Sequence, residues 1–216
     1  MKIETDFSIR TFRGGYDNNF SYLVSCMQTG IQFLIDAAIS LDKIKPYINQ
    51  PLSALLITHS HGDHIAHLND ILHEYPNAKF IGYKNLIHKS NKYEFSPVND
   101  QDRILLGKIN IKTIHTPGHF PDSVCYLMEH IIFTGDTLFV GRTGRTIGAN
   151  ASTKDLYYSI YDKILSLPGN TLIYPGHDYG EKPTISLREN IKISPLLQAK
   201  SEKDFIERMA NYEANR

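Results

Sequence analysis

The chain has 216 residues, 41% of them hydrophobic and 21% charged, and its 23 lysines and arginines balance 23 aspartates and glutamates. This length suits a single domain, and the composition excludes disordered, collagen-like and coiled-coil chains. No run of basic residues indicates a nucleic-acid partner, and no stretch approaches the ~18 apolar residues of a membrane span, so we expect a cytoplasmic protein without membrane partners.

The first predicted elements lead to a histidine-rich loop near residue 60. They are three strands, a short helix and a fourth strand, over 2–12, 21–26, 32–37, 41–48 and 52–58. The last is a nearly continuous apolar run, which indicates a strand buried on both faces. Apolar residues at helical spacing then predict a helix over 65–75, ended by Pro76. The histidine-rich loop therefore connects a buried strand to a helix.

The remaining predicted elements alternate between strands and helices. Strands are expected over 78–83, 103–115, 123–133 and 171–174, helices over 153–165 and 201–212, and an irregular polar stretch over 85–102. No linker, low-complexity tract or repeat divides the chain. The sequence thus predicts one α/β domain over 1–216, in which residues 184–216 form a short C-terminal helical tail.

Ten histidines are the unusual feature of the composition. Three of them, with one aspartate, fall within the six residues His59-Ser60-His61-Gly62-Asp63-His64. Neutral imidazole suits zinc and similar metals, and a loop can direct residues two apart toward one ion while their neighbours face another. The two cysteines, Cys26 and Cys125, form no C-x-x-C motif, and we interpret them as buried structural thiols.

Three later loops, each after a predicted strand, carry further candidate ligands. These are His119 in Thr-Pro-Gly-His, Asp136 in Thr-Gly-Asp and His177 in Pro-Gly-His. Each short motif is weak by itself, but the set in this order is far more specific. Two other histidines have interpretations that involve no metal. His67 lies on the predicted helix and is interpreted as a surface residue, and His115 ends a strand and is interpreted as a structural group.

At these motifs the chain resembles the metallo-β-lactamase superfamily, whose H-x-H-x-D-H motif matches residues 59–64. The resemblance implies a four-layer αββα sandwich that holds two divalent ions, zinc in the first instance, with iron or manganese as alternatives. Carried over by position, it implies that His59, His61 and His119 bind the first ion and Asp63, His64 and His177 the second. Asp136 would bridge both ions.

Within the superfamily the chain looks most like the glyoxalase II-like hydrolases. The diiron flavoproteins have glutamate where this chain has His61, and secreted β-lactamases often have cysteine at the place of Asp136. The resemblance implies substrate-binding roles for Arg145 and Tyr179. The structural alternatives are that Arg145 forms an ion pair that orders its loop and that Tyr179 packs over the metal site. Longer glyoxalase II enzymes also have Gly-Cys-Gly-Arg where residues 142–145 read Arg-Thr-Gly-Arg, and an extra helical domain for glutathione.

The resemblance implies attack by metal-bound hydroxide, with Asp63 and Asp136 as the catalytic carboxylates. A thiolate leaves with little help from a general acid, because the pKa of a thiol is ~8.5, and this favours thioester substrates. The predicted function is therefore hydrolysis of S-acyl thiols such as hydroxyacylglutathione.

Two alternatives remain open. One is a persulfide dioxygenase with a single iron on His59, His119 and Asp136, and the other is a non-catalytic binding protein. The acyl group, the thiol carrier, the native metal and the oligomeric state also stay open.

Overall fold

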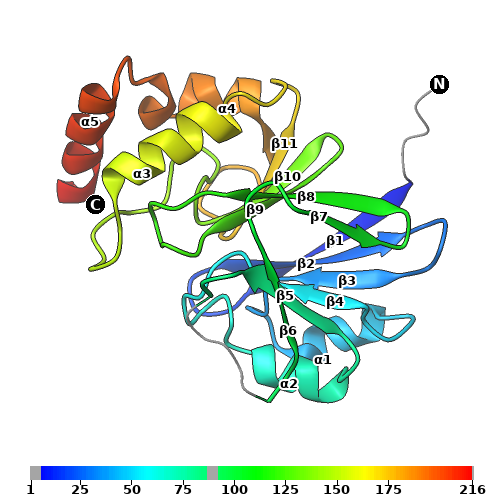
Figure 1. Cartoon of the computed structure of the whole chain (residues 1–216). Helices are drawn as coiled ribbons and strands as arrows, with labels where there is room; N and C mark the ends of the chain where they lie inside the picture. Colours follow the sequence, from blue (N-terminus) through cyan, green and yellow to red (C-terminus); the bar gives the residue numbers. More distant parts are fainter. Residues whose placement is uncertain (1–5, 87–91, 216) are drawn as a thin grey trace.

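Two β-sheets face each other and carry helices on their outer sides in the computed structural model, which describes residues 6–86 and 92–215 (Figure 1). The first sheet has the order β1-β2-β3-β4-β5-β6, with the bounds Phe7–Gly14, Asn19–Cys26, Gln32–Ile35, Ala54–Leu56, Lys79–Tyr83 and Phe95–Val98. The second has the order β12-β11-β10-β9-β8-β7, with the bounds Ile185–Ser186, Leu172–Pro175, Ile131–Gly135, Val124–Met128, Ile109–His115 and Arg103–Leu106.

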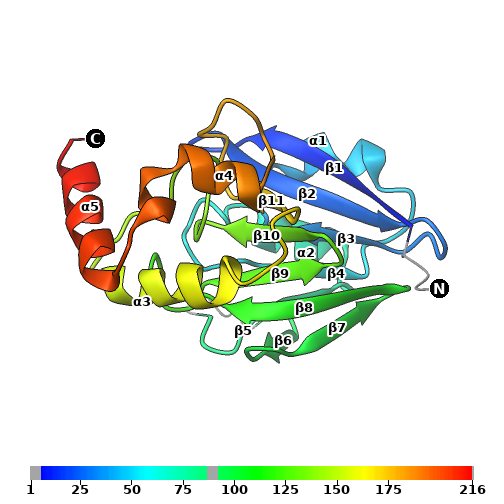
Figure 2. The same cartoon turned by 90° about the horizontal axis from the view of Figure 1, so that it is seen from above.

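The helices form the two outer layers, as the view from above also shows (Figure 2). The first sheet is covered by α1 (Leu41–Ile44), the 3-10 helix η1 (Lys45–Tyr47) and α2 (Leu68–Glu74). The second is covered by α3 (Thr153–Tyr158), the π-helical turn η2 (Ser159–Ile164), α4 (Leu187–Ile193), the 3-10 helix η3 (Pro195–Gln198) and α5 (Glu202–Ala214). In the part of the chain that the structure describes, no helix is both long and apolar enough to cross a membrane.

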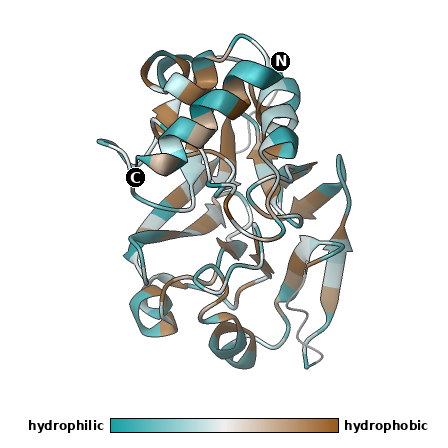
Figure 3. Ribbon diagram, turned by 90° about the vertical axis from the view of Figure 1, so that its left-hand side faces the viewer, coloured by the Kyte–Doolittle hydropathy of each residue, from teal (hydrophilic) through white to brown (hydrophobic). Residues whose placement is uncertain are grey.

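The alternation of side chains along the strands explains the layering, because successive residues of a strand point to opposite faces. In β2, Tyr22 and Val24 belong to the core between the sheets, whereas Leu23 packs toward α1 and α2. A third core under α3 to α5 includes Cys125 of β9, and both cysteines are buried. Figure 3 shows hydrophobic residues along the strands and hydrophilic ones over much of the helices. The predicted αββα fold is confirmed.

Several predicted element bounds were wrong. The runs 103–115 and 123–133 are each two antiparallel strands, because the chain turns at Gly107 and at Glu129, both with positive φ. The stretch 85–102 contains β6, whose parallel pairing with β5 places Pro97 on an edge strand. Helix 153–165 turns π-helical after Tyr158. Residues 2–5 of the first predicted strand lie outside the described residues.

Candidate metal centre

The seven predicted ligands come from four loops that meet at one edge of the two sheets. His59, His61, Asp63 and His64 follow β4, His119 lies between β8 and β9, Asp136 follows β10 and His177 follows β11. Strands β10 and β11 are parallel, so Asp136 and His177 leave the sheet in the same direction. Gly176 allows close approach here, because a Cβ at this position would collide with a carboxylate oxygen of Asp136.

The seven side chains form two groups, in each of which the donor atoms lie within 4.8 Å of one another. The first group is His59, His61, His119 and Asp136, and the second is Asp63, His64 and His177.

Short distances link the members of each group. In the first group, Nε2 of His59 and Nε2 of His119 both lie 3.0 Å from Nδ1 of His61. In the second, Nε2 of His64 lies 3.2 Å from Nε2 of His177. Asp136 stands between the groups, since its Oδ2 lies 3.5 Å from Nε2 of His119 and 3.4 Å from Nε2 of His177.

The outward-facing nitrogens of the histidines fix how the rings present their inner nitrogens. Nδ1 of His119 donates to the backbone oxygen of Arg145 at 2.8 Å, and Nδ1 of His177 donates to that of Asp17 at 2.7 Å. A carbonyl oxygen can only accept, so Nε2 of both rings carries no hydrogen when the ring is neutral. Its lone pair then points into the cluster, as a metal ligand requires.

His64 is oriented in the same way by a carboxylate. Its Nδ1 donates to Oδ2 of Asp36 at 2.8 Å, and the hydroxyl and backbone N–H of Thr58 also donate to Asp36. Oδ1 of Asp136 is buried without a hydrogen bond, although it lies 3.1 Å from Nε2 of His64. Such an orphaned oxygen is rare in folded proteins, and a cation would satisfy it. The donor set therefore fits divalent metal ions.

The pKa values of two candidate ligands, His61 and His177, shift in opposite directions. Burial, followed by repulsion from His119, lowers the pKa of His61 to about 4. Burial also lowers the pKa of His177, but hydrogen bonds to Asp136 and Asp63 outweigh it and raise the pKa to about 9. A metal ion would take the place of the proton on His177, because ligating imidazole must be neutral.

Asp63 is held as an anion facing the open side of the centre. Burial opposes its ionisation, but hydrogen bonds from His177 and Asn19 and the charge of His64 outweigh burial and lower the pKa of its carboxyl. Nδ2 of Asn19 donates to Oδ2 of Asp63 at 2.8 Å. The side chain of Asp63 keeps 25% exposure, so it can also contact a bound molecule.

A cavity of about 530 Å³ lies over the metal ligands. Its lining includes both predicted substrate-binding residues, Arg145 and Tyr179, together with Tyr16, Asp17 and Asp63. The ring of Tyr179 stacks on His177, with centroids 4.8 Å apart and 5° between the planes, and its hydroxyl donates to Oδ2 of Asp17. The structure thus brings Arg145 and Tyr179 to the same cavity as the ligands.

Asp17, Asn19 and Asp36 were not predicted from the sequence. A signal existed for Asp36, the only carboxylate in the apolar stretch 32–37, but it was read as part of a strand. Asp17 lies in the turn between β1 and β2 and Asn19 is the first residue of β2, and neither belongs to a metal-binding motif. By contrast, His115 agrees with its structural interpretation, since it stacks on Tyr83 at 3.8 Å and lies outside both groups.

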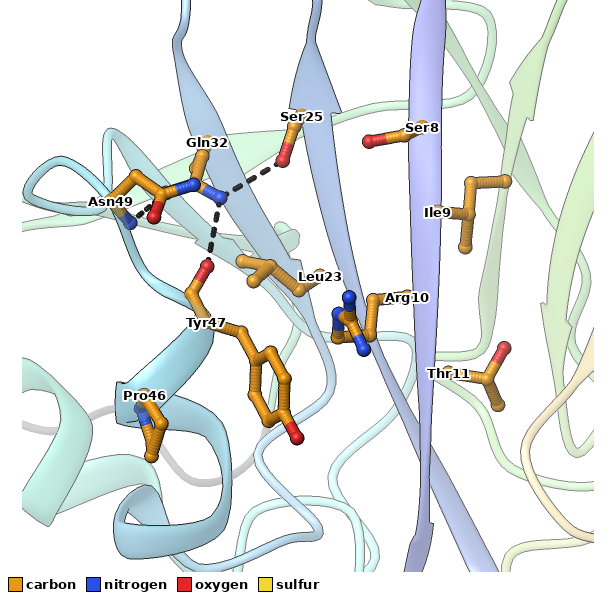
Figure 4. A pocket seen from close by; sticks show the side chains of 10 residues that line it. All are labelled: Ser8, Ile9, Arg10, Thr11, Leu23, Ser25, Gln32, Pro46, Tyr47 and Asn49. Atoms are coloured by element: carbon orange, nitrogen blue, oxygen red, sulfur yellow. Dashed lines mark hydrogen bonds between the residues drawn. The ribbon is translucent and has the colours of Figure 1, made fainter.

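A larger cavity of about 590 Å³ lies elsewhere, beside β1, β2 and η1 (Figure 4). Its inner wall is the buried amide of Gln32, whose Nε2 donates to Oγ of Ser25 and to the backbone oxygen of Tyr47, while its Oε1 accepts from the backbone N–H of Asn49. Among the described residues that line it there is no histidine, cysteine or carboxylate. The smaller cavity over the candidate metal ligands is therefore the candidate active site.

Comparisons with known proteins indicate the class of enzyme. A probable hydroxyacylglutathione hydrolase, glo2, of Schizosaccharomyces pombe is 33% identical over 176 residues, which cover 76% of this chain and 66% of that protein, just under two thirds of its length. The hydroxyacylglutathione hydrolase of Francisella philomiragia is 31% identical in an alignment of 234 positions, which covers 93% of this chain and 87% of that protein. These relatives support the prediction of a metal-dependent hydrolase.

Solved structures and a family model identify the fold and the superfamily. The crystal structure of ETHE1 from Myxococcus xanthus matches with a TM-score of 0.83 and 28% identity, covering 95% of this chain and 91% of that one. A metallo-beta-lactamase from Staphylococcus aureus matches with a TM-score of 0.81 and 26% identity, covering 96% and 67%. The model of the metallo-beta-lactamase superfamily matches residues 14–177. The resemblance predicted from the motifs is confirmed, and the chain belongs to the metallo-beta-lactamase superfamily.

Proposed function

We propose that the protein is a dinuclear metal-dependent hydrolase, a glyoxalase II-like thioesterase that acts on S-acyl thiols such as hydroxyacylglutathione. The observation that carries this proposal is the pair of adjacent donor groups, between which Asp136 of the first group stands. The names of the relatives from Schizosaccharomyces pombe and Francisella philomiragia favour a glutathione thioester. Zinc is the proposed metal, with iron and manganese as alternatives.

The proposed roles of the ligands follow the two groups. The first ion would be held by His59, His61 and His119, the second by Asp63, His64 and His177, and both by Asp136. A pair of divalent ions supplies a hydroxide at neutral pH and polarises a carbonyl group.

In this scheme Asp63 orients the attacking water. Asn19 fixes one of its carboxylate oxygens, and the lowered pKa keeps the group ionised, so that it accepts a hydrogen bond from the water. Hydrolysis then needs no further general acid if the leaving group is a thiolate, whose conjugate acid has a pKa of ~8.5.

Arg145 and Tyr179 are the proposed substrate-binding residues. The guanidinium group of Arg145 can bind a carboxylate of the thiol carrier through two parallel hydrogen bonds. Tyr179 differs from Arg145, because its hydroxyl already donates a hydrogen bond to the carboxylate of Asp17. We assign the Tyr179 ring the role of a wall that confines the substrate beside His177.

We also propose that residues 184–216 are a helical tail of the same domain. Phe205 and Met209 of α5 belong to the core under the second sheet. Oε1 of Glu213 accepts from the backbone N–H of Thr146 at 2.6 Å, next to Arg145. The last helix therefore supports the loop that carries Arg145.

Metal analysis combined with two assays tests the function. Protein purified without added metal, and protein reloaded with zinc, should hold two ions per chain and hydrolyse a hydroxyacylglutathione, and chelation should abolish the hydrolysis. The variant His67→Ala is the control, since His67 lies outside both donor groups. One iron per chain with oxygen uptake on glutathione persulfide would instead establish the dioxygenase, and metal-loaded protein inactive in both assays would favour a binding protein.

A further inference from the structure

We propose that a second cavity, which shares Tyr179 with the cavity over the metal centre, binds the anionic end of the thiol carrier. This inference rests on the proposed thioesterase function. The second cavity has a volume of about 500 Å³ and lies between the 179–182 segment, the 140–142 segment and helix α4. None of its lining residues except Tyr179 also lines the cavity over the metal centre.

The lining of this cavity combines an apolar floor with cations at the rim. Val140 and Ile185 are buried, and Ile193 is 55% exposed. The cations are Arg142, Lys182 and Lys192.

Two carboxylates also line the cavity, Glu181 and Glu189. The carboxylate of Glu189 is already engaged, because its Oε2 accepts from the hydroxyl of Ser186 at 2.9 Å. Three cations against two carboxylates leave an excess of positive charge beside apolar surface. A ligand with an apolar stretch and an anionic end complements such a lining.

Tyr179 is the structural link between the two cavities. Its ring lies 4.8 Å from the ring of His177 and 5.4 Å from the guanidinium carbon of Arg142, so Arg142 is no farther than about 10 Å from the metal ligand. An extended chain spans about 3.3 to 3.6 Å per residue, so a carrier as long as about three residues covers that distance. The cations are therefore within reach of a carrier whose sulfur lies at the metal centre and whose chain passes along the edge of Tyr179.

Arg142 is oriented for this role. One of its terminal nitrogens, Nη2, donates to the backbone oxygen of Tyr179 at 3.2 Å. A guanidinium group has five N–H donors, so several remain for a ligand. Arg145 lies in the other cavity, and the two arginines thus define separate anchoring points for a carrier.

The ligand must carry, besides its thiol, an anionic group that reaches Arg142, whose guanidinium carbon lies no farther than about 10 Å from the ring of His177. A peptide thiol supplies it as a carboxylate, and a phosphopantetheine-type thiol supplies it as a phosphate. Both bind arginine and lysine through charge-assisted hydrogen bonds. Substrates built on a peptide thiol and on a phosphopantetheine-type thiol therefore show whether the bound group is a carboxylate or a phosphate.

The test compares one acyl group on three carriers, namely glutathione, coenzyme A and the neutral N-acetylcysteamine. The double variant Lys182→Ala/Lys192→Ala removes two exposed cations of the cavity. We expect KM for an anionic carrier to rise about 5-fold to 30-fold with kcat unchanged, because exposed ion contacts each contribute ~0.5 to 1 kcal/mol and act on a part of the substrate that does not react. KM for N-acetylcysteamine should not change.

Lys203→Ala is the matched control, since this lysine is 86% exposed on α5 and outside both cavities. Lys182→Glu should raise KM further than Lys182→Ala, and added salt should shrink both effects. An effect confined to glutathione identifies a carboxylate, and one confined to coenzyme A identifies a phosphate. Unchanged KM for both anionic carriers, or an equal rise for N-acetylcysteamine, would overturn the inference.

Calorimetry with the free carriers separates this inference from the proposed function. If zinc-loaded protein hydrolyses no thioester but binds glutathione or coenzyme A more tightly than the double variant does, the thioesterase proposal fails and the anionic site stands. If thioesters are hydrolysed and the double variant binds and turns over both carriers like the parent, the anionic site is refuted and the thioesterase stands.

Discussion

The floor and the rim of the cavity over the metal centre differ in how firmly their side chains are held. On the floor, His59, His64 and His177 are at most 3% exposed, and partners hold the outer nitrogens of the latter two. On the rim, Tyr16 is 95% exposed and Arg145 is also exposed.

This difference indicates that the floor and the rim contribute to different steps, namely the chemical step and substrate binding. Side chains that are locked before binding stabilise the transition state without reorganisation, so the floor suits the chemical step. Side chains that must be ordered on binding contribute mainly to substrate affinity. Substitutions on the floor should therefore lower kcat or metal affinity, whereas substitutions on the rim should raise KM.

The largest effect is expected for Asp63→Ala on the floor. The change removes a proposed metal ligand and the carboxylate that would orient the attacking water, so we expect kcat to fall by about 1,000-fold or more. Steady-state kinetics with metal analysis measures it, and Asp70→Ala, at a 73% exposed aspartate on α2, is the control. Near-normal hydrolysis by the Asp63 variant would remove this residue from the mechanism.

A smaller effect is expected for Asp36→Ala, because Asp36 contacts the candidate ligand His64 and belongs to neither donor group itself. His64 would lose the acceptor of its Nδ1–H, and Thr58 would lose the acceptor of its hydroxyl. Such partners typically affect metal affinity by about 10-fold to 100-fold. Titration with zinc should show weaker binding at the site that contains His64 and little change at the other. Equal weakening of both sites would mean that Asp36 supports the fold of the whole centre instead.

Asp36 also shows what the sequence could and could not predict. The candidate ligands could be predicted because four of them fall in one short motif and the others follow strands in short motifs that end in Gly-His or Gly-Asp. Asp36 and His64 are 28 positions apart, and Asp17 and His177 are 160 apart. Their contacts depend on how β1 to β4 pair and how the sheets stack, which no local pattern encodes.

The same reason explains the errors in the strands. Hydrophobic pattern predicted where apolar segments lie, but the turns at Gly107 and Glu129 interrupt runs that read as continuous. Strand β6 has little apolar pattern, and its pairing with β5 makes it a strand. Layers and core positions follow from composition and periodicity, whereas turns and edge strands depend on tertiary pairing.

On the rim, Arg145→Ala should raise KM for a glutathione thioester more than it lowers kcat. The guanidinium group would be lost, whereas the backbone oxygen that holds His119 would remain. We expect a rise of about 5-fold to 30-fold, because a charge-assisted contact of ~1.5 to 3 kcal/mol is weakened by solvent at an exposed site. A thioester without carboxylates should be unaffected. If kcat falls instead while KM holds, Arg145 orders its loop.

The smallest effect concerns a contact outside the cavity, between Asp100 and Lys163. Nζ of Lys163 donates to Oδ2 of Asp100 at 2.9 Å and to the backbone oxygen of His115 at 2.7 Å, which ties η2 to the end of β8, just before the loop that carries His119. Burial opposes ionisation of Asp100, but the hydrogen bonds from Lys163 and from the backbone of His115 outweigh it and lower its pKa.

Because the pKa of Asp100 is lower in the folded state, its contribution to stability is complete above the unfolded value of ~3.9 and is lost as the pH falls through the folded value. Asp100 is 36% exposed, so we expect Asp100→Asn to lower the free energy of unfolding by no more than ~0.5 to 1 kcal/mol, or Tm by about 1 to 4 °C, at pH 7. Thermal melts from pH 7 to pH 3 should show this gap unchanged down to about pH 5 and smaller below pH 4.

The variant Asp162→Asn, at an exposed aspartate of η2, is the control for a change of charge alone. A gap that persists unchanged at pH 3 would mean that Asp100 acts through packing and not through its charge. Zinc affinity should equal that of the parent, because the hydrogen bonds of the floor come from Asp17, Asp36 and the backbone of Arg145. If zinc affinity falls together with Tm, the floor depends on the outer contacts of η2, and its rigidity is a property of the whole second sheet with its helices.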